Sequence, residues 1–196
     1  EASDLERFNE LSTDLGLVYR AFESTSFYLN YSEAMQANYQ IDDAGTNIEK
    51  PELSDQWELG TKSQLLNGRL STTAALFSIR KQNVVNIDFD EGLRVARFDG
   101  ELEANGFDLD LSYQATRSFD MVAALSHVDA KILKGENEGN IPALVAENTA
   151  SIFANYRVAG RATGLGFLHH VDELSSNAGA YRIGERFGDD NNSFSL

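Results

Sequence analysis

Apolar and polar residues alternate with a period of two along most of the chain, and helical spacing is scarce. The clearest example is the segment 57–65, in which Trp57 and Leu59 share one face while Glu58 and Lys62 share the other. Such alternation is typical of β-strands with two different faces. It predicts about eight antiparallel strands, and the other clear segments are 14–20, 27–32, 70–76, 107–113, 121–127 and 150–156.

The connections between these segments alternate in length. Short turns are predicted near 23–25, 67–68, 116–118 and 160–161, and Asn67-Gly68 is a strong signal for a type I′ hairpin turn. Long polar segments occupy roughly 34–52, 86–103 and 133–147. An up-and-down sheet with this order has all its tight turns at one end and all its long loops at the other. Transmembrane β-barrels sort their connections in this way.

The two faces of the predicted strands differ in chemistry. One face carries charged and amide side chains such as Glu58, Lys62 and Asp108, whereas the other ends in aromatic residues. Aromatic strand ends suit the interfacial girdles of an outer-membrane barrel, although Tyr is also common in half-buried strands of soluble proteins. The aromatic strand ends are Tyr19, Tyr31, Trp57, Tyr113 and Tyr156.

Composition removes several classes of function. The 196 residues include 16 Lys and Arg against 31 Asp and Glu, a formal net charge of −15, which argues against nucleic acid as a partner. The absence of cysteine excludes disulfides and Cys-ligated metal sites. A hydrophobic content of 42% without a long apolar run is what alternating lipid-facing and lumen-facing residues produce.

An ordered series of segments resembles the TonB-dependent outer-membrane receptors. Leu15-Gly-Leu-Val-Tyr-Arg20 and Phe27-Tyr-Leu-Asn-Tyr-Ser-Glu33 resemble the paired strands "LGLVYR…LYxxYSE" of that family. The segment 50–62 is similar to "KPExSxxxELGxK", and 105–112 resembles "GxExDLS". Further matches are Asn67-Gly-Arg-Leu-Ser71, Ala75-Leu-Phe77, Lys81-Gln-Asn83, Ser126-His-Val-Asp-Ala-Lys131 and Gly184-Glu-Arg-Phe-Gly-Asp-Asp190. The collinear matches cover about residues 11–193 and are most like the ferric-siderophore receptors.

The resemblance implies an all-β fold: an antiparallel up-and-down transmembrane β-barrel, closed around an N-terminal plug, of the 22-stranded class. It implies location in the bacterial outer membrane, contact with membrane lipid, and energised uptake through TonB, which contacts the plug. No segment here resembles the plug or a TonB-contact box. We therefore expect residues 1–196 to be part of a larger barrel, with the plug and the final strands absent from this chain.

The sequence departs from the family pattern at two places. Ala146 and Asn148 replace the Pro and His of an "NVPxH" run before the segment that begins at Thr149. Residues 169–179 separate Gly164-Leu-Gly166 from the "GERxGD" match, where the family runs on directly. We expect these eleven residues to be an added loop, a bulged strand or a degenerate sequence, and the strand register after residue 168 is left open.

No group of residues predicts catalysis or a cofactor, so the sequence does not indicate an enzyme. His127 lies on an apolar face and is interpreted as an interfacial residue. His169 and His170 point to opposite faces of a strand and cannot easily bind one ion. Asp42-Asp43 and Asp189-Asp190-Asn191-Asn192 offer oxygen ligands that suit Ca²⁺, but neither has the spacing of a calcium loop.

Ligand capture in such receptors falls to aromatic and polar side chains on the long loops. From their placement, the candidates are Tyr39, Phe89, Phe98 and Phe187. The leading hypothesis is a receptor that takes up a ferric siderophore, or a similar metal chelate, by TonB-coupled transport. The alternatives are a plugless outer-membrane channel or small structural barrel, and a soluble acidic β-domain that binds proteins.

Overall fold

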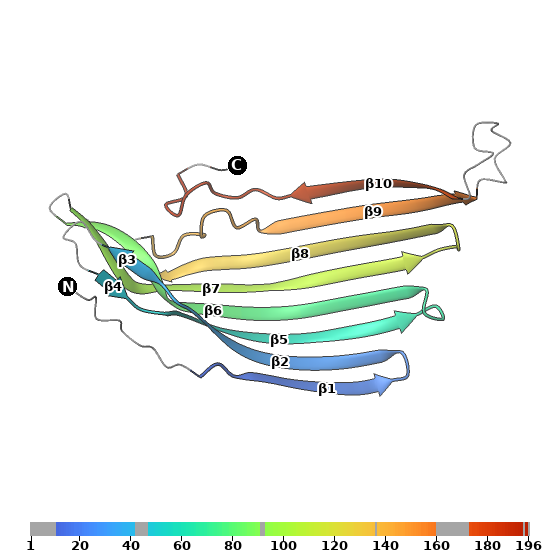
Figure 1. The fold of residues 1–196 in the computed structure, drawn as a ribbon, viewed down its shortest axis with the longest axis horizontal. Helices are drawn as coiled ribbons and strands as arrows, with labels where there is room; N and C mark the ends of the chain where they lie inside the picture. Colours follow the sequence, from blue (N-terminus) through green and yellow to red (C-terminus); the bar gives the residue numbers. More distant parts are fainter. Residues whose placement is uncertain are drawn as a thin grey trace.

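The computed structural model describes residues 11–41, 47–90, 93–135, 137–159, 173–193 and 195. Eight strands form one antiparallel sheet in the order β1-β2-β5-β6-β7-β8-β9-β10, which confirms the predicted up-and-down sheet (Figure 1). Within these ranges no helix is long and apolar enough to cross a membrane. The strands are β1 (Asp14–Phe22), β2 (Thr25–Gln36), β3 (Tyr39–Ile41), β4 (Asn47–Glu49), β5 (Glu52–Leu65), β6 (Leu70–Asp90), β7 (Leu93–Gln114), β8 (Phe119–Lys134), β9 (Asn148–Ala159) and β10 (Glu173–Ile183).

Tight turns gather at one end of the sheet, as predicted. The β1–β2 turn spans 23–24 and the β7–β8 connection spans 115–118, both at the right-hand end in Figure 1. Between β2 and β5, in the predicted long segment 34–52, the separate two-stranded hairpin β3–β4 stands at the opposite end. The predicted turn at 160–161 lies outside the described residues.

The β5–β6 loop contains the turn that Asn67-Gly68 predicts, in which Arg69 N donates to Leu66 O at 3.3 Å and φ is 58° at Asn67 and 82° at Gly68, and it also contains a second turn one residue earlier. Leu65 pairs with Leu70, and the backbone N–H of Gly68 donates to Leu65 O at 3.1 Å. The two central residues of this turn are therefore Leu66 and Asn67, with φ of 53° and 58°. Positive φ at both central residues is the feature of a type I′ turn, but a leucine adopts it only with strain.

The prediction of a long loop at 86–103 is wrong, because residues 86–90 and 93–103 continue the β6–β7 hairpin. Register pairs run from Leu70 with Tyr113 to Asp90 with Leu93, with shifts near Asn83 and Asp99. The strands have 21 and 22 residues, whereas a tilted strand crosses a bilayer in roughly 9–11. About half of the hairpin therefore extends beyond a membrane. The polar residues at 86–103 mark where the strands leave apolar surroundings, rather than where they end.

The segment 169–179 is largely a regular strand. From Glu173 to Gly179 it belongs to β10, which pairs with β9 over eleven residues without a register shift. His169 and His170 lie outside the described residues. The third predicted long loop is confirmed: β8 ends at Lys134, β9 begins at Asn148, and between them the backbone bonds to the free edge of β8, for example from Val128 N to Glu147 O at 2.8 Å.

The sheet has an apolar outer face and a polar inner face. Directly paired residues of neighbouring strands form a row across the sheet, which we call a rung. One rung across five strands defines the outer face and consists of Leu17, Leu29, Leu59, Leu76 and Phe107. Leu17, Leu59 and Leu76 are 66%, 53% and 60% exposed. A soluble sheet buries such a row against a core, so this face requires an apolar environment of the kind that lipid provides. The inner face, opposite to it, carries Tyr28, Glu58, Lys62, Asp108 and Asp110.

Along a rung of the outer face, the side chains change from apolar to polar between one edge of the sheet and the other. The rung that begins with Leu15, Tyr31 and Trp57 continues as Ser78, Asn105 and Asp129. Strands of a barrel tilt by roughly 35–45° from its axis, so a rung does not stay at one depth. This rung therefore leaves the apolar layer at β6. Tyr31 and Trp57, with ring centroids 4.7 Å apart, lie just below the point where it emerges.

A charge on the outer face should cost most at the middle of the apolar rung. We expect Leu59→Arg to lower the free energy of unfolding by about 2–4 kcal/mol, whereas Ser78→Arg, at the edge of the apolar layer, should cost about 0–1 kcal/mol. Urea unfolding of the full-length protein in lipid vesicles measures both. Equal costs at the two positions would contradict the assignment of the outer face.

Relieving the strain at Leu66 should stabilise the barrel. Asparagine tolerates positive φ, so Leu66→Asn should raise the free energy of unfolding by about 1 kcal/mol. Glu23→Asn, in the β1–β2 turn and without positive φ, is the matched control and should have little effect. The same unfolding measurement applies, and a destabilised Leu66→Asn variant would show that Leu66 gains more from its contacts than it loses to strain.

Candidate functional site

The inner face holds a hydrogen-bonded group on β2 and β5. The hydroxyl of Tyr28 donates to Glu58 Oε1 at 2.6 Å, and Gln56 Nε2 donates to Glu58 Oε2 at 3.1 Å. Lys62 Nζ lies 5.2 Å from the centroid of the Tyr28 ring, within the range of a cation–π contact. Successive side chains of a strand point to opposite faces. Gln56, Glu58 and Lys62 are separated by two and four positions on β5, so they share the inner face.

Two further charged groups line the inner face. Across β8 and β9, Asp120 Oδ1 accepts hydrogen bonds from Asn155 at 3.1 Å and from Arg157 at 3.2 Å. Nearer the loop end, Lys81 Nζ forms an ion pair with Glu52 at 2.7 Å. Such partly exposed pairs contribute little to stability. Their effect is to hold polar side chains in place on a wall that faces water or a polar occupant.

The candidate ligand contacts all lie at the loop end of the molecule. Tyr39 pairs with Glu49 in the β3–β4 hairpin, and Phe89 lies near the tip of the β6–β7 hairpin. Phe98 is also in that hairpin, but its side chain is only 6% exposed, and its carbonyl accepts a hydrogen bond from Lys50 Nζ at 3.1 Å. Phe187 follows β10 and is half-buried. The structure thus brings the four to one end without joining them into a single cluster.

Two loops at this end are bound to each other, which sequence reasoning did not predict. The side chain of Asn192 both accepts from Ile141 N at 3.0 Å and donates to Ile141 O at 2.8 Å. Leu144 N donates to the carbonyl of Phe187 at 2.9 Å. The β8–β9 loop and the segment after β10 are therefore one hydrogen-bonded unit. An amide that pairs with both groups of one residue gives no signal in the sequence, because its partner is fifty-one positions away.

The calcium candidates find other partners where they are described. Asp189 accepts hydrogen bonds from the backbone N–H and the hydroxyl of Ser193, and Asp190 accepts one from Ala143 N. The described residues include no group of three or more His, Cys, Asp or Glu side chains that could hold a metal ion. Asp42 and Asp43 lie outside the described residues. His127, assigned to an interface, contacts the Phe107 ring at 5.7 Å and hydrogen-bonds Asn148 at 2.9 Å.

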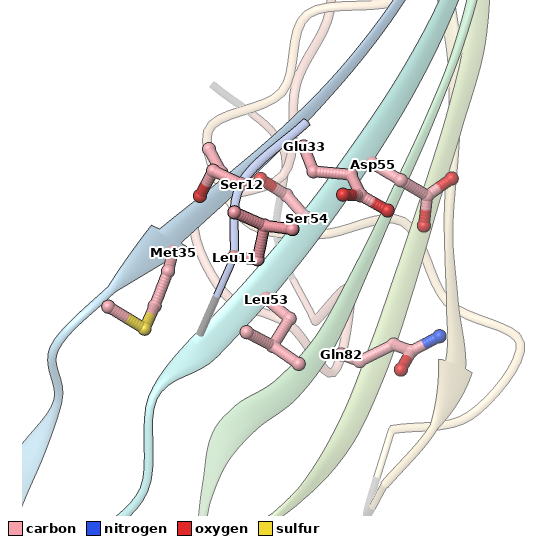
Figure 2. A pocket seen from close by; sticks show the side chains of 9 residues that line it. Leu11, Ser12, Glu33, Met35, Leu53, Ser54, Asp55 and Gln82 are labelled. Atoms are coloured by element: carbon pink, nitrogen blue, oxygen red, sulfur yellow. The ribbon is translucent and has the colours of Figure 1, made fainter. Parts of the chain in front are cut away.

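A hollow of about 250 Å³ lies on the outer face, beyond the apolar rungs (Figure 2). Glu33 and Asp55 stand directly opposite each other across β2 and β5. Hydrogen bonds from the Tyr31 hydroxyl and from Thr13 N lower the pKa of the Glu33 carboxyl. Two like charges side by side destabilise a sheet unless water or counter-ions screen them. This hollow therefore belongs to the polar zone outside the apolar layer and does not open on the inner wall.

Comparisons with known proteins agree with this architecture. The chain is 30% identical over 195 residues to the metal-pseudopaline receptor CntO of Pseudomonas aeruginosa. The alignment covers 98% of this chain and 26% of that protein. It is 26% identical to the ferrichrome outer membrane transporter/phage receptor of Escherichia coli K12, over 92% of this chain and 23% of the relative. The chain thus spans about a quarter of the length of the curated relatives that it matches, and these relatives are transport receptors rather than enzymes.

Solved structures show the same fold. The ferric preacinetobactin receptor BauA of Acinetobacter baumannii superposes with a TM-score of 0.73 at 19% identity, over 94% of this chain and 27% of that one. The ferric yersiniabactin uptake receptor FyuA of Yersinia pestis superposes with a TM-score of 0.74 at 16% identity, over 93% and 27%.

A model of the family described as "TonB dependent receptor-like, beta-barrel" matches residues 2–196. The match covers nearly the whole chain, and it agrees with the antiparallel sheet, with the exposed apolar outer face and with the polar inner face. It also sets aside the alternative of a soluble acidic β-domain. The chain belongs to the TonB-dependent receptor β-barrel family, whose members reside in the outer membrane of Gram-negative bacteria.

Proposed function

We propose that the protein containing this chain is an outer-membrane receptor that takes up a ferric siderophore, or a similar metal chelate, by TonB-coupled active transport. The observation that carries the proposal is the two-faced sheet, with an apolar outer face and a polar inner wall, in a chain whose relatives include receptors for metal-pseudopaline and ferrichrome. A polar wall behind a lipid-facing surface suits a barrel that passes a hydrophilic solute.

Transport in this proposal involves no covalent chemistry and no resident cofactor, so the protein is not an enzyme. The chelate binds at the loop end, and TonB then drives a rearrangement of the plug from the periplasm. We propose that the plug, through which TonB acts, and the remaining strands belong to other parts of the protein, since this chain spans about a quarter of its relatives.

We propose that Tyr39, Phe89 and Phe187 contact the chelate, and that Phe98 acts with them from inside the β6–β7 hairpin. The support is placement: all four lie at the end of the molecule opposite the tight turns. For Phe187, the hydrogen bond from Leu144 N to its carbonyl fixes the backbone that carries the ring. Phe98 is buried, so its contribution is to hold the hairpin in shape.

Uptake by whole cells tests the function. A strain that lacks the full-length gene and its paralogues, grown under iron limitation, is complemented with the gene and offered radiolabelled metal chelates of ferrichrome, ferrioxamine B, pyoverdine and pseudopaline. We expect saturable uptake of at least one chelate, abolished in a TonB-deficient strain. Uptake that persists without TonB would indicate the plugless channel instead, and no uptake of any chelate would refute the substrate class.

Alanine substitutions test the aromatic contacts. Tyr39→Ala, Phe89→Ala and Phe187→Ala should each weaken chelate binding by about tenfold, or ~1.4 kcal/mol, at unchanged stability. Phe98→Ala should instead lower the free energy of unfolding by about 3–5 kcal/mol, as for a buried aromatic residue. Tyr156→Ala, an exposed aromatic at the opposite end, is the matched control. Unchanged binding in the Tyr39, Phe89 and Phe187 variants would show that other groups capture the chelate.

A further inference from the structure

On the inner face, aromatic side chains stand directly opposite glycines of the neighbouring strand. Tyr28 of β2 pairs with Gly60 of β5, and Phe153 of β9 pairs with Gly179 of β10. A third pair joins Phe77 of β6 to Gly106 of β7. Gly60 and Gly106 belong to the segments that resemble the receptor family, but neither contributes a side chain to the site described above. Their positions opposite aromatic rings give them a common role.

Each of these glycines provides the space that the opposing ring occupies. A Cβ at Gly60 would overlap the Tyr28 side chain, and a Cβ at Gly179 would overlap the Phe153 ring, with only atoms of that aromatic side chain nearest in each case. At Gly106 the backbone oxygen of His127 would also be in the way, so that position is constrained for a second reason. The rings of Tyr28 and Phe153 therefore lie across the neighbouring strand instead of standing out from the wall.

A comparison on the same face shows that this is not a general property of its glycines. Gly16 of β1 lies opposite Asn30, and a Cβ there would meet only Asn30 Oδ1 at 3.5 Å, an ordinary van der Waals distance. Gly60 is buried beneath Tyr28, whose hydroxyl is also held by Glu58 at 2.6 Å. Phe153 keeps 48% of its surface exposed to the inner side even though it lies against the wall.

We infer that Gly60 and Gly179 determine the free width of the barrel interior, because they allow Tyr28 and Phe153 to lie against the inner wall, out of the path of a transported chelate. The inference rests on the proposed function. A side chain at either glycine would overlap the ring and so turn the ring inward. The glycines thus act as positioning residues for transport: they affect passage, and not capture at the loop end.

An aromatic ring over a glycine can also simply stabilise a sheet. The two roles differ in one consequence. If the pair only stabilises the sheet, removing the ring is as harmful as filling the glycine. If the pair keeps the passage clear, removing the ring repairs the defect that a larger residue at the glycine causes.

Uptake kinetics of the full-length receptor separate these roles. The variants are Gly60→Ala, Gly179→Ala, Tyr28→Ala, Tyr28→Phe and Phe153→Ala, together with the double variants at each pair. Gly16→Ala is the matched control, because it makes the same change on the same face with no ring above it. Cells expressing each variant take up the radiolabelled chelates of ferrichrome, ferrioxamine B, pyoverdine and pseudopaline, and rates are divided by the amount of folded receptor at the cell surface.

We expect Gly60→Ala and Gly179→Ala to lower the maximal uptake rate by about tenfold, equivalent to ~1.4 kcal/mol on the transport barrier, while the dissociation constant of the chelate at the cell surface stays unchanged. Tyr28→Ala combined with Gly60→Ala should transport as fast as Tyr28→Ala alone, and Phe153→Ala combined with Gly179→Ala should restore the wild-type rate. Tyr28→Phe combined with Gly60→Ala keeps the ring and should not restore it. Gly16→Ala and Phe153→Ala should transport normally, and Tyr28→Ala, which also removes a hydrogen-bond donor to Glu58, sets the reference rate for its own double variant.

Wild-type rates in both glycine variants would overturn the inference, and so would double variants that stay slow. If Gly60→Ala does not reach the surface, the Gly179 and Phe153 pair decides. Loss of surface receptor at both pairs, not relieved by removing the rings, would make the glycines purely structural and also overturn it. A wild-type receptor that takes up none of the four chelates overturns the proposed function itself, which distinguishes the two failures.

Discussion

The backbone hydrogen bond is the constraint on which the rest of this structure depends. In hydrocarbon an unpaired N–H or C=O group costs several kcal/mol, so a chain that crosses a membrane as strands must pair each strand with a neighbour on both sides. In the described sheet β2 and β5 to β9 have a neighbour on both sides, whereas β1 and β10 have one. Once the backbone is paired, positions along a strand differ from one another mainly in the face of the sheet to which the side chain points.

That restriction divides the chemistry of the chain between its two faces. Outer positions such as Leu59 and Leu76 need only be apolar, because lipid makes no specific contacts with them. Inner positions meet one another and whatever occupies the barrel, so their identities are more particular: Glu58 binds Tyr28 and Gln56, and Asp120 binds Asn155 and Arg157. A glycine on the inner face is therefore as informative as a charge, since it determines where a neighbouring ring can lie.

Beyond the apolar layer the same strands serve a different purpose. The β6–β7 hairpin continues well past the length that a bilayer needs, and hydrogen bonds of Asn192 join the β8–β9 loop to the segment after β10. The loop end is thus supported by paired backbone and by loop-to-loop bonds. A rigid support of this kind suits capture of a solute outside the membrane, ahead of its passage along the inner wall.

The alternation around Trp57–Leu65 and the order of tight turns were enough to predict an up-and-down barrel, because period-two burial is a local property of a strand. Other features depended on neighbours distant in the chain. The hairpin continued through residues 86–90 and 93–103 because both strands kept their partners, and a turn at Leu66 joined the predicted one at Asn67-Gly68 because Leu65 pairs with Leu70. Burial separated Phe98 from the other candidate contacts, and only the register placed Gly60 opposite Tyr28. By itself the sequence determined which residues face lipid, whereas the tertiary structure decided which inner residues meet, because strand register arises from pairing between distant segments and leaves no local pattern.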